Sequence, residues 1–209
     1  MTQQTQDLQE QITELEQKLY GMTLELAELR RQVPRHQGEV VPEYEFATCA
    51  GSTTLLDLFG DKDLLMVIHN MGQACRYCTL WGDGFNGFLP HLESAMSVVL
   101  VSKDDPQTQR EFANHRGWRF QLASHGGGAY IQEEATMPGQ SNMPGVVVYE
   151  RDGQTVRRRD SAVFGPGDLY CSAWNLLALA GLTEAEWMPQ FNYWRRPEQL
   201  EDGGENIID

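Results

Sequence analysis

Apolar residues in the first 33 positions of the chain recur at spacings of four and three residues in alternation. The series consists of Leu8, Ile12, Leu15, Leu19, Met22, Leu26, Leu29 and Val33. It has the form of a heptad seam, with mostly Gln, Glu, Lys and Arg between its members. The pattern predicts one long helix over residues 1–33, ended by Pro34.

Two arrangements of this helix compete: a coiled-coil dimer, and an amphipathic helix that lies on its own domain. The strict period of about 3.5 residues is narrower than the apolar face of most globular helices. Glu25 and Arg30 are also placed for an ion pair between the two strands of a parallel dimer. We therefore expect a homodimer through the N-terminal helix.

From Val40 onward the pattern changes to short apolar runs separated by turn residues. The segments expected to be strands are 44–48, 64–69, 97–102, 119–124, 145–150 and 154–164. The segments expected to be helices are 75–94, 106–117 and 169–180, with a short helical turn at 54–59. The near-continuous apolar runs at 64–69 and 97–102 are typical of strands buried on both faces of a sheet.

Turn and capping residues predict the boundaries of these elements. Pro90 should kink the helix over 75–94, and Asp105 and Asp168 should each cap a helix. Turns are expected at Gly51-Ser52 and at Asp152-Gly153, and a loop over 132–143.

The order of elements is strand, helix, strand, helix, then a hairpin and a last helix. Strands that alternate with helices pair in parallel, and a closing hairpin adds antiparallel members. The expected fold class is therefore α/β, with a mixed sheet flanked by helices over residues 40–196. The tail over 197–209 is acidic and is expected to be disordered.

Composition and charge narrow the range of partners. The chain has 209 residues and a formal net charge of −14, so its surface repels nucleic acid and anionic lipid. No apolar run is long enough to cross a bilayer, and the polar N-terminus lacks the order of a secretory signal. We therefore expect a cytoplasmic protein with neither nucleic acid nor membrane as partner. The run 157–159, three arginines on a strand, is interpreted as a solvated edge.

The four cysteines are Cys49, Cys75, Cys78 and Cys171. In a reducing compartment a permanent disulfide framework is improbable. Only Cys75 and Cys78 are close in sequence, and a lone C-x-x-C pair in such a chain indicates redox or metal chemistry. Cys49 and Cys171 are interpreted as small buried side chains.

The C-x-x-C pair follows a predicted buried strand and opens a helix, an order that resembles the peroxiredoxin-type branch of the thioredoxin superfamily. Within that branch the chain is similar to domain-of-unknown-function family 899, described as a predicted dithiol–disulfide oxidoreductase. The resemblance covers most of residues 24–180. It is carried by YEF (44–46), LLDLFGDKDLLMVIHNM (55–71), CRYCTLWGDGFNGFLPHL (75–92), VVLVSKDD (98–105), RGWRF (116–120) and PGVVVYERDG (144–153).

The resemblance implies a thioredoxin-like fold, and two features depart from the family's pattern. The stretch 124–130, SHGGGAY, stands where the family carries a short run with Ser and Asp. The heptad segment extends upstream of the family's usual start. Both departures bear on the substrate and the assembly rather than on the fold.

Disulfide exchange needs a thiolate that attacks and a second thiol that releases the mixed disulfide. A cysteine at a helix N-terminus meets unpaired N–H groups and the positive end of the helix dipole, which lower its pKa from about 8.5 to about 3.5–7.5. Cys75 is therefore predicted to be the nucleophile and Cys78 the resolving thiol. Arg76 adds positive charge that favours the thiolate. The pair Arg76-Tyr77 gives no simple forecast of the redox potential.

A zinc site is the alternative for this cysteine pair. Structural zinc takes four ligands, and the chain has no second C-x-x-C and no H-x-x-H. His69 and Cys49 could complete a ligand set only by coincidence of the fold. We therefore expect neither a metal nor a cofactor.

The resemblance also implies supporting residues. Thioredoxin-like proteins place a cis-proline loop opposite the cysteine pair, and Pro144 matches that position, with Met143 as the residue whose backbone could pair with an extended substrate. His69 lies where thioredoxins carry a buried acid. It could relay a proton to or from Cys78, since histidine titrates near neutral pH, or it could be a satisfied core histidine.

The leading functional hypothesis is a thiol–disulfide oxidoreductase that acts on protein or small-molecule disulfides. Peroxide reduction is a second hypothesis, but the residues at 69–74 lack the Pro and the hydroxyl of the peroxiredoxin pattern Pro-x-x-x-Thr/Ser-x-x-Cys. A third hypothesis, from another class, is a dimeric scaffold or binding protein whose heptad helix is functional and whose cysteines are vestigial.

Overall fold

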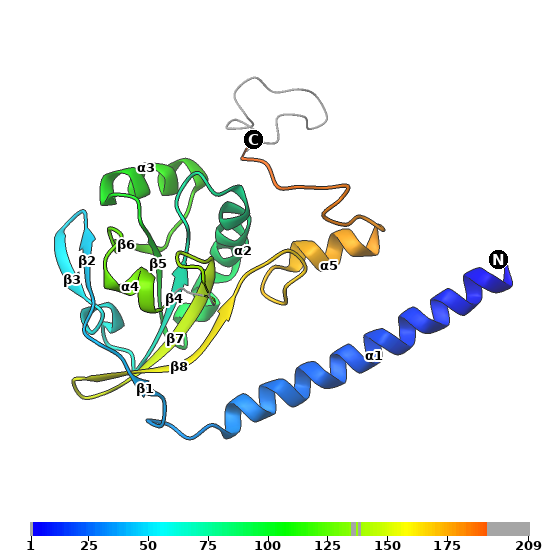
Figure 1. Cartoon of the computed structure of the whole chain (residues 1–209), viewed down its shortest axis with the longest axis horizontal. Coiled ribbons are helices and arrows are strands. Elements are labelled where there is room, and N and C mark those ends of the chain that lie inside the picture. The colour runs from blue at the N-terminus through cyan, green and yellow to red at the C-terminus, as the bar shows by residue number, and fades with distance from the viewer. Residues whose placement is uncertain (1, 135–136, 138, 192–209) are drawn as a thin grey trace. The chain divides into compact units, whose positions relative to one another are not determined.

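The structure is a computed structural model that describes residues 2–134, 137 and 139–191 (Figure 1). The chain divides into two compact units, residues 1–37 and 38–209. The acidic tail predicted to be disordered, 197–209, lies outside the described residues.

The first unit is the helix α1 (Gln3–Gln32), the long helix that the heptad pattern predicts. The hydroxyl of Thr2 caps it by accepting a hydrogen bond from the N–H of Thr5. None of the residues of α1 is buried. The eight side chains of the heptad seam, from Leu8 to Val33, are between 38% and 66% exposed. No residue within α1 itself covers this seam, and the dimer stays a prediction.

The second unit is built on a mixed sheet. In the described residues its strands are β1 (Glu39–Val40), β2 (Glu45–Thr48), β3 (Gly51–Thr54), β4 (Leu64–His69), β5 (Ser97–Ser102), β6 (Gln121–Ser124), β7 (Gly145–Asp152) and β8 (Thr155–Val163). The strand order is β1-β8-β7-β4-β5-β6-β2-β3. β4, β5 and β6 are parallel, whereas the other neighbours pair antiparallel. The predicted parallel core with an antiparallel closing hairpin is confirmed.

Helices cover both faces of this sheet (Figure 1). They are the 3-10 helix η1 (Asp57–Phe59) and the α-helices α2 (Arg76–Glu93), α3 (Pro106–Arg116), α4 (Ala129–Glu133) and α5 (Ser172–Leu179). On one face α2, α3 and α5 contribute Trp81, Ala113 and Trp174 to an apolar cluster. On the other face η1 and α4 contribute Phe59 and Tyr130 to a second cluster. The expected α/β fold is confirmed.

The central strand β4 feeds both clusters because successive side chains of a strand point to opposite faces. Leu65 and Val67 lie in the cluster of η1 and α4, and Ile68 lies in the cluster of α2. His69 ends the strand and therefore points to the same face as Leu65 and Val67. This places the His69 side chain on the opposite face of the sheet from α2.

Capping and breaking residues act where the sequence predicts. The carboxylate of Asp105 accepts hydrogen bonds from the first N–H groups of α3, and Gly117 ends that helix with a φ of 66°. In α2, Phe88 leaves helical geometry just before Pro90. Proline has no N–H for the carbonyl four residues earlier.

Two boundaries predicted from the sequence are wrong. Gly51-Ser52 is not a turn, because Gly51–Thr54 forms β3 and the turn of this hairpin lies at residues 49–50. Asp168 does not cap the last helix directly. Its carboxylate instead accepts from the N–H groups of Tyr170 and Cys171 in a turn, and α5 begins three residues later than expected, at Ser172.

Besides β3, two further elements are additional to the prediction. β1 pairs with β8 at the edge of the sheet, and α4 begins just before the expected loop over 132–143. β1 has two residues and α4 has five, so both are too short to show a hydrophobic period.

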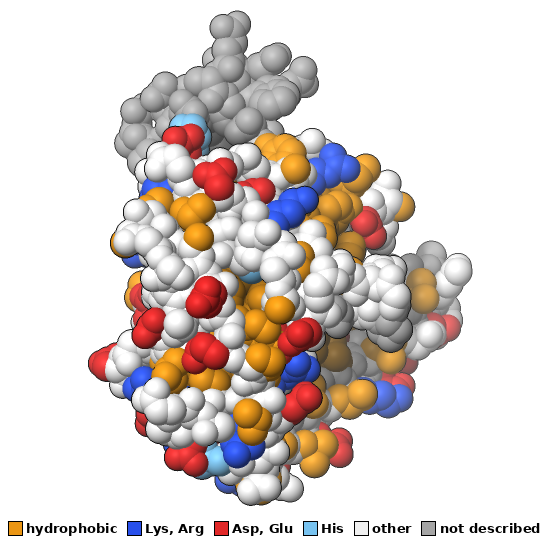
Figure 2. Space-filling model, turned by 60° about the vertical axis from the view of Figure 1, so that its left-hand side comes forward, with side chains coloured by type: hydrophobic (Ala, Val, Ile, Leu, Met, Phe, Trp, Pro, Cys, Tyr) orange, Lys and Arg blue, Asp and Glu red, His pale blue; other side chains and the backbone are white. Residues whose placement is uncertain are grey.

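Acidic side chains are spread over the face of the molecule shown in Figure 2, with Lys and Arg side chains between them. This agrees with the formal net charge of −14. Within the described ranges, no helix is both long and apolar enough to span a membrane.

Candidate redox site at the start of α2

Cys75 and Cys78 form a disulfide at the N-terminus of α2, with their Cα atoms 5.2 Å apart. Cys75 is the N-cap of the helix: its backbone is extended, and its Sγ accepts a hydrogen bond of 3.1 Å from the N–H of Cys78. Its carbonyl accepts the N–H and the hydroxyl of Thr79. Cys75 is half-buried and Cys78 is buried, so Cys75 is the more accessible sulfur to a partner.

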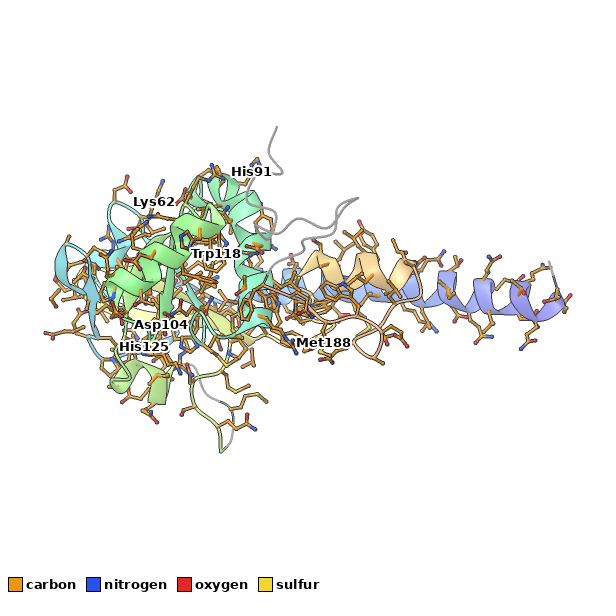
Figure 3. All side chains as sticks on the ribbon, turned by 90° about the horizontal axis from the view of Figure 1, so that it is seen from above. Lys62, His91, Asp104, Trp118, His125 and Met188 are labelled. Atoms are coloured by element: carbon orange, nitrogen blue, oxygen red, sulfur yellow. A yellow bond between two sulfur atoms is a disulfide. The ribbon has the colours of Figure 1, made fainter. Side chains whose placement is uncertain are left out.

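The two residues between the cysteines contact a segment more than 100 positions later in the chain. The hydroxyl of Tyr77 donates to Glu184 over 2.8 Å, and the guanidinium of Arg76 lies 3.2 Å from the sulfur of Met188. Met188 is labelled in Figure 3. The hydrogen bond to the Glu184 carboxylate, with a smaller contribution from burial, raises the pKa of Tyr77. Sequence reasoning missed Glu184 and Met188, because no local pattern connects them with the C-x-x-C pair.

His69 is buried, and both of its ring nitrogens are engaged. Nδ1 contacts the carbonyl oxygen of Met143, and Nε2 lies 3.3 Å from Nε2 of His125. His125 belongs to the stretch 124–130, which departs from the family pattern, and sequence reasoning missed it as a partner of His69. In the described residues, the ring nitrogens of His69 and His125 have these partners and no hydrogen bond to a cysteine.

The hydrogen bonds of these two histidines determine their protonation. A carbonyl oxygen only accepts, so Nδ1 of His69 carries a proton and Nε2 of neutral His69 is an acceptor. The N–H of Gly127 donates to Nδ1 of His125 over 3.1 Å, so His125 carries its proton on Nε2 and donates it to His69. Both imidazoles are fully satisfied in the neutral state. A second proton on either ring breaks one of these hydrogen bonds.

Burial lowers the pKa of His125 to about 4, with smaller contributions from the positive charge that His69 carries when protonated and from Lys103. The pKa of His69 is also lowered, by burial, although its bond to Met143 opposes the shift. Because the unfolded chain takes up these protons at a pH near 6.5 and the folded chain does not, acid favours unfolding. The stability from this pair is complete above pH 6.5 and falls as the pH drops toward 4.

We expect His125→Gln, which cannot titrate at this position, to flatten the dependence of stability on pH. The free energy of unfolding of the parent should fall between pH 7 and pH 4 by about 2–3 kcal/mol more than that of the variant. Urea unfolding at several pH values measures the difference. His91→Gln, at an exposed histidine of α2, is the matched control and should leave the slope unchanged. Equal slopes for His125→Gln and the parent would contradict the assignment.

The peptide bond before Pro144 is trans, as are all peptide bonds of the described residues, so the cis bond implied by the resemblance is wrong. Trans is the isomer that X-Pro bonds favour. In this conformation the Met143 carbonyl faces His69. His69, Met143 and Pro144 are also among the residues that line a small cavity of about 40 Å³ beside β7.

The described residues contain no cluster of three or more His, Cys, Asp and Glu side chains placed to hold a metal ion. The protonation of the His69–His125 pair also does not suit metal binding. A metal-bound histidine binds through an unprotonated nitrogen and donates the other N–H. At His125 the N–H of Gly127 already occupies Nδ1 as a donor, which leaves the proton on Nε2.

The remaining cysteines lie apart from this pair. Cys171 is buried, as expected, and burial raises the pKa of its thiol. Cys49 is exposed in the β2–β3 turn, where its Sγ lies 3.3 Å from the carbonyl of Pro106, so its interpretation as a buried side chain is wrong. The shift of the turn from 51–52 to 49–50 is the physical reason.

Two of the stretches that carry the resemblance contact each other: GDGFNG in α2, and RGWRF, which begins at the last residue of α3. The carboxylate of Asp83 accepts the indole N–H of Trp118 over 2.8 Å and pairs with Arg116. A Cβ on Gly82 would lie 2.5 Å from the indole of Trp118, so only glycine fits there. The carbonyl of Asn86, which Pro90 leaves without its helical partner, accepts from Arg119. These contacts hold α2 against the end of α3 and the segment that follows it.

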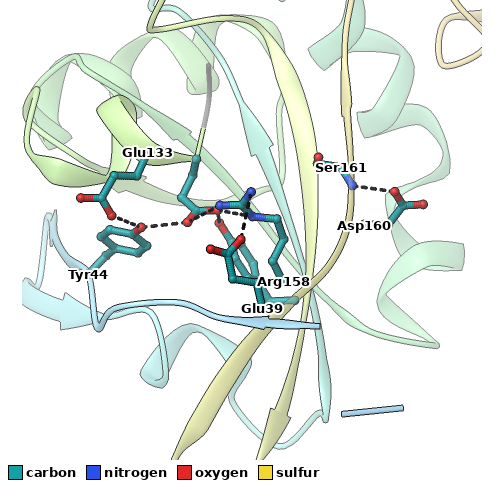
Figure 4. Close-up of polar contacts among 8 residues, drawn as sticks. Glu39, Tyr44, Glu133, Arg158, Asp160 and Ser161 are labelled. Carbon is teal, nitrogen blue, oxygen red and sulfur yellow. Dashed lines mark hydrogen bonds and ion pairs between the residues drawn. The ribbon is translucent and has the colours of Figure 1, made fainter. Parts of the chain in front are cut away.

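The three arginines at 157–159 are half-buried and paired, so their interpretation as a solvated edge is wrong. Arg158 binds both carboxylate oxygens of buried Glu134 at 2.9 Å, and Glu134 also accepts from the hydroxyls of Tyr44 and Tyr149 (Figure 4). A buried carboxylate needs such partners. This network ties the end of α4, and with it the loop of His125, to the sheet.

Comparison with known proteins identifies a family that this chain matches. A protein-family model described as "Bacterial protein of unknown function (DUF899)" matches residues 2–199. The match begins before the heptad seam, so the expectation that this segment lies upstream of the family's usual start is wrong. The chain finds no match among curated proteins.

Solved structures similar to this chain include peroxiredoxin-type proteins. Peroxidoxin BcpB from Mycobacterium tuberculosis has a TM-score of 0.51 at 20% identity, over 68% of this chain and 93% of that one. Peroxiredoxin Q from Xanthomonas campestris has a TM-score of 0.47 at 20% identity, over 65% and 87% of the two chains. At this identity the likeness to the mycobacterial protein shows the fold alone, which is thioredoxin-like, as predicted.

Proposed function

The chain belongs to the DUF899 family of bacterial proteins of unknown function, and we propose that it is a thiol–disulfide oxidoreductase. Cys75 is the nucleophile and Cys78 the resolving thiol. The observation that carries this proposal is the hydrogen bond from the N–H of Cys78 to Sγ of Cys75 at the cap of α2. A thiolate in that position accepts a charge-assisted hydrogen bond and faces the positive end of the helix dipole.

In the reducing direction the thiolate of Cys75 attacks one sulfur of a substrate disulfide. The substrate S–S bond breaks, and its leaving sulfur departs as a thiolate that takes up a proton. Cys78 then loses its proton to solvent and attacks Sγ of Cys75. The second substrate sulfur leaves, and the Cys75–Cys78 disulfide forms. Two electrons pass from the pair to the substrate, and the structure corresponds to the oxidised product.

Neighbouring residues support this chemistry in different ways. The charge of Arg76 favours the thiolate of the adjacent Cys75. Because His69 already uses both ring nitrogens, it supports the site by holding the carbonyl of Met143 rather than by relaying a proton to Cys78. The substrates are disulfides of proteins or of small molecules.

The same proposal includes a homodimer formed through α1. The heptad seam is exposed along the whole helix, and its spacing matches the packing of a second identical helix. A coiled coil would remove these side chains from water, which favours association by about 25 cal/mol per Å² of apolar surface buried.

A dimeric scaffold with vestigial cysteines is the competing function. The exposed seam of α1 is compatible with a dimeric scaffold as well as with a dimeric oxidoreductase, so it does not separate the two functions. Assays of the full chain separate the two. We expect the reduced protein to reduce insulin disulfides in the presence of dithiothreitol, and the pH profile of Cys75 alkylation to give a pKa below that of a free thiol. A pKa near the free value of about 8.5, with no acceleration of insulin reduction, would favour the scaffold and exclude the oxidoreductase.

A further inference from the structure

The turn between β4 and α2 determines where Cys75 lies, and a series of hydrogen bonds fixes its backbone. The N–H of Asn70 continues the β4–β5 pairing by donating to the carbonyl of Val101 over 2.8 Å. The Asn70 side chain then accepts the N–H of Gly72 over 2.8 Å. The carbonyl of Gly72 accepts the N–H of Cys75 over 3.0 Å. Cys75 is therefore held through the backbone of Gly72.

Asp104 closes this turn from the end of the neighbouring strand β5 (Figure 3). One carboxylate oxygen accepts the N–H of Gln73 over 2.7 Å. The other packs so closely on Gly72 that a Cβ there would lie 2.9 Å from it. Gly72 has a φ of 117°, a conformation that residues with a side chain rarely adopt. The Asp104 carboxylate thus contacts the chain at Gln73 and at Gly72, two and three residues before Cys75.

Asp104 is itself held in place from behind. The buried side chain of Gln109 in α3 donates to the carbonyl of Asp104 over 3.0 Å and to the hydroxyl of Ser102 over 2.8 Å. The same hydroxyl accepts the N–H of Asp104 over 3.2 Å. A carboxylate on such a rigid support can fix the position of the turn in front of it.

We propose that Asp104 is a positioning residue for Cys75, which holds the turn by its hydrogen bond and moderates the acidity of the Cys75 thiol by its charge. The negative charge opposes the stabilisation that the N-terminus of α2 gives to the thiolate. The hydrogen bond and the charge can be separated, because asparagine keeps an acceptor oxygen and loses the charge, whereas alanine loses both. The inference concerns the thiol at the centre of the proposed function, but thiol acidity can be measured without any substrate.

The test compares Asp104→Asn and Asp104→Ala with the parent in the full chain. The first readout is the pH profile of Cys75 alkylation by iodoacetamide in the reduced protein, followed by peptide mass spectrometry. We expect Asp104→Asn to lower the pKa of Cys75 by about half a unit. Asp61→Asn makes the same change of charge in the exposed loop before β4, at the far end of that strand, and should leave the pKa unchanged.

The second readout is kcat/KM for reduction of 2-hydroxyethyl disulfide. We expect Asp104→Ala to lower it about tenfold through loss of positioning, and Asp104→Asn to stay within about threefold of the parent. An unchanged Cys75 pKa in Asp104→Asn would overturn the role of the charge. Equal kcat/KM values for the alanine and asparagine variants would overturn the role of the hydrogen bond. If alanine prevents folding, the asparagine pKa alone decides.

The outcomes also separate this inference from the proposed function. A lowered Cys75 pKa in Asp104→Asn, in a protein that reduces no disulfide, would leave the inference standing and exclude the oxidoreductase. If the parent reduces disulfides but Asp104→Asn leaves the pKa of Cys75 unchanged, the oxidoreductase stands and the role of the Asp104 charge is excluded.

Discussion

Cys75→Ser will lower the rate of disulfide reduction to that of the reaction without protein. A serine hydroxyl stays protonated at neutral pH and is a far weaker nucleophile than a thiolate, so no mixed disulfide can form. Insulin precipitation in dithiothreitol and the reduction of 2-hydroxyethyl disulfide measure the loss. Cys49→Ser, at the exposed cysteine of the β2–β3 turn, is the matched control and should keep full activity.

Cys78→Ser tests the second half of the same mechanism. Without the resolving thiol, the mixed disulfide on Cys75 persists, and mass spectrometry should detect the adduct with a substrate thiol. Full activity in Cys75→Ser, or adducts on Cys49 in place of Cys75, would contradict the assignment of the nucleophile. Adducts captured by the Cys78→Ser protein in cells would identify the natural partner.

We expect two glutamates in the heptad seam to convert the proposed dimer to a monomer. Leu19→Glu and Leu26→Glu, introduced together, would bury carboxylates where the coiled coil packs leucines. Each leucine contributes about 1.5–3 kcal/mol when fully buried, and an unpaired buried charge costs more. Sedimentation equilibrium should give twice the chain mass of 23.7 kDa for the parent and the single mass for the variant.

The control uses the same chemical change on the other faces of α1. Tyr20 and Leu24 are exposed and lie outside the seam, so Tyr20→Glu with Leu24→Glu should remain dimeric. If both double variants have the mass of the parent, the seam does not mediate association. A monomeric parent would exclude the coiled coil altogether and leave α1 as a single helix.

Residues that act within a few positions of one another could be predicted from the sequence. Apolar spacing predicted α1 and the central strands β4 and β5, and Asp105, Gly117 and Pro90 act on their helices as expected. These signals are local, because a cap or a break concerns one turn of helix and a period needs only consecutive side chains. The position of Cys75 at the cap of α2 follows from the same local rules.

Several errors arose where a local signal has more than one outcome. Gly-Ser and Asp favour turns in general, so Gly51 and Asp168 mark a turn nearby without fixing the residue at which a strand or helix begins. The expected cis bond before Pro144 is an error of another kind, because it was implied by the family resemblance, whereas X-Pro bonds by themselves favour the trans isomer that the structure has. A proline permits either isomer, and the surrounding tertiary structure selects one.

The surroundings of the cysteine pair were decided by the tertiary structure alone. Glu184 contacts Tyr77 across 107 positions of sequence, and His125 contacts His69 across 56. Asp104 reaches the turn before Cys75 because β4 and β5 lie side by side. No periodicity or capping rule encodes such pairs, since each depends on how strands and helices far apart in the chain pack together. The sequence by itself therefore determined most of the elements and the position of the cysteine pair at the start of α2, whereas packing determined which side chains surround that pair.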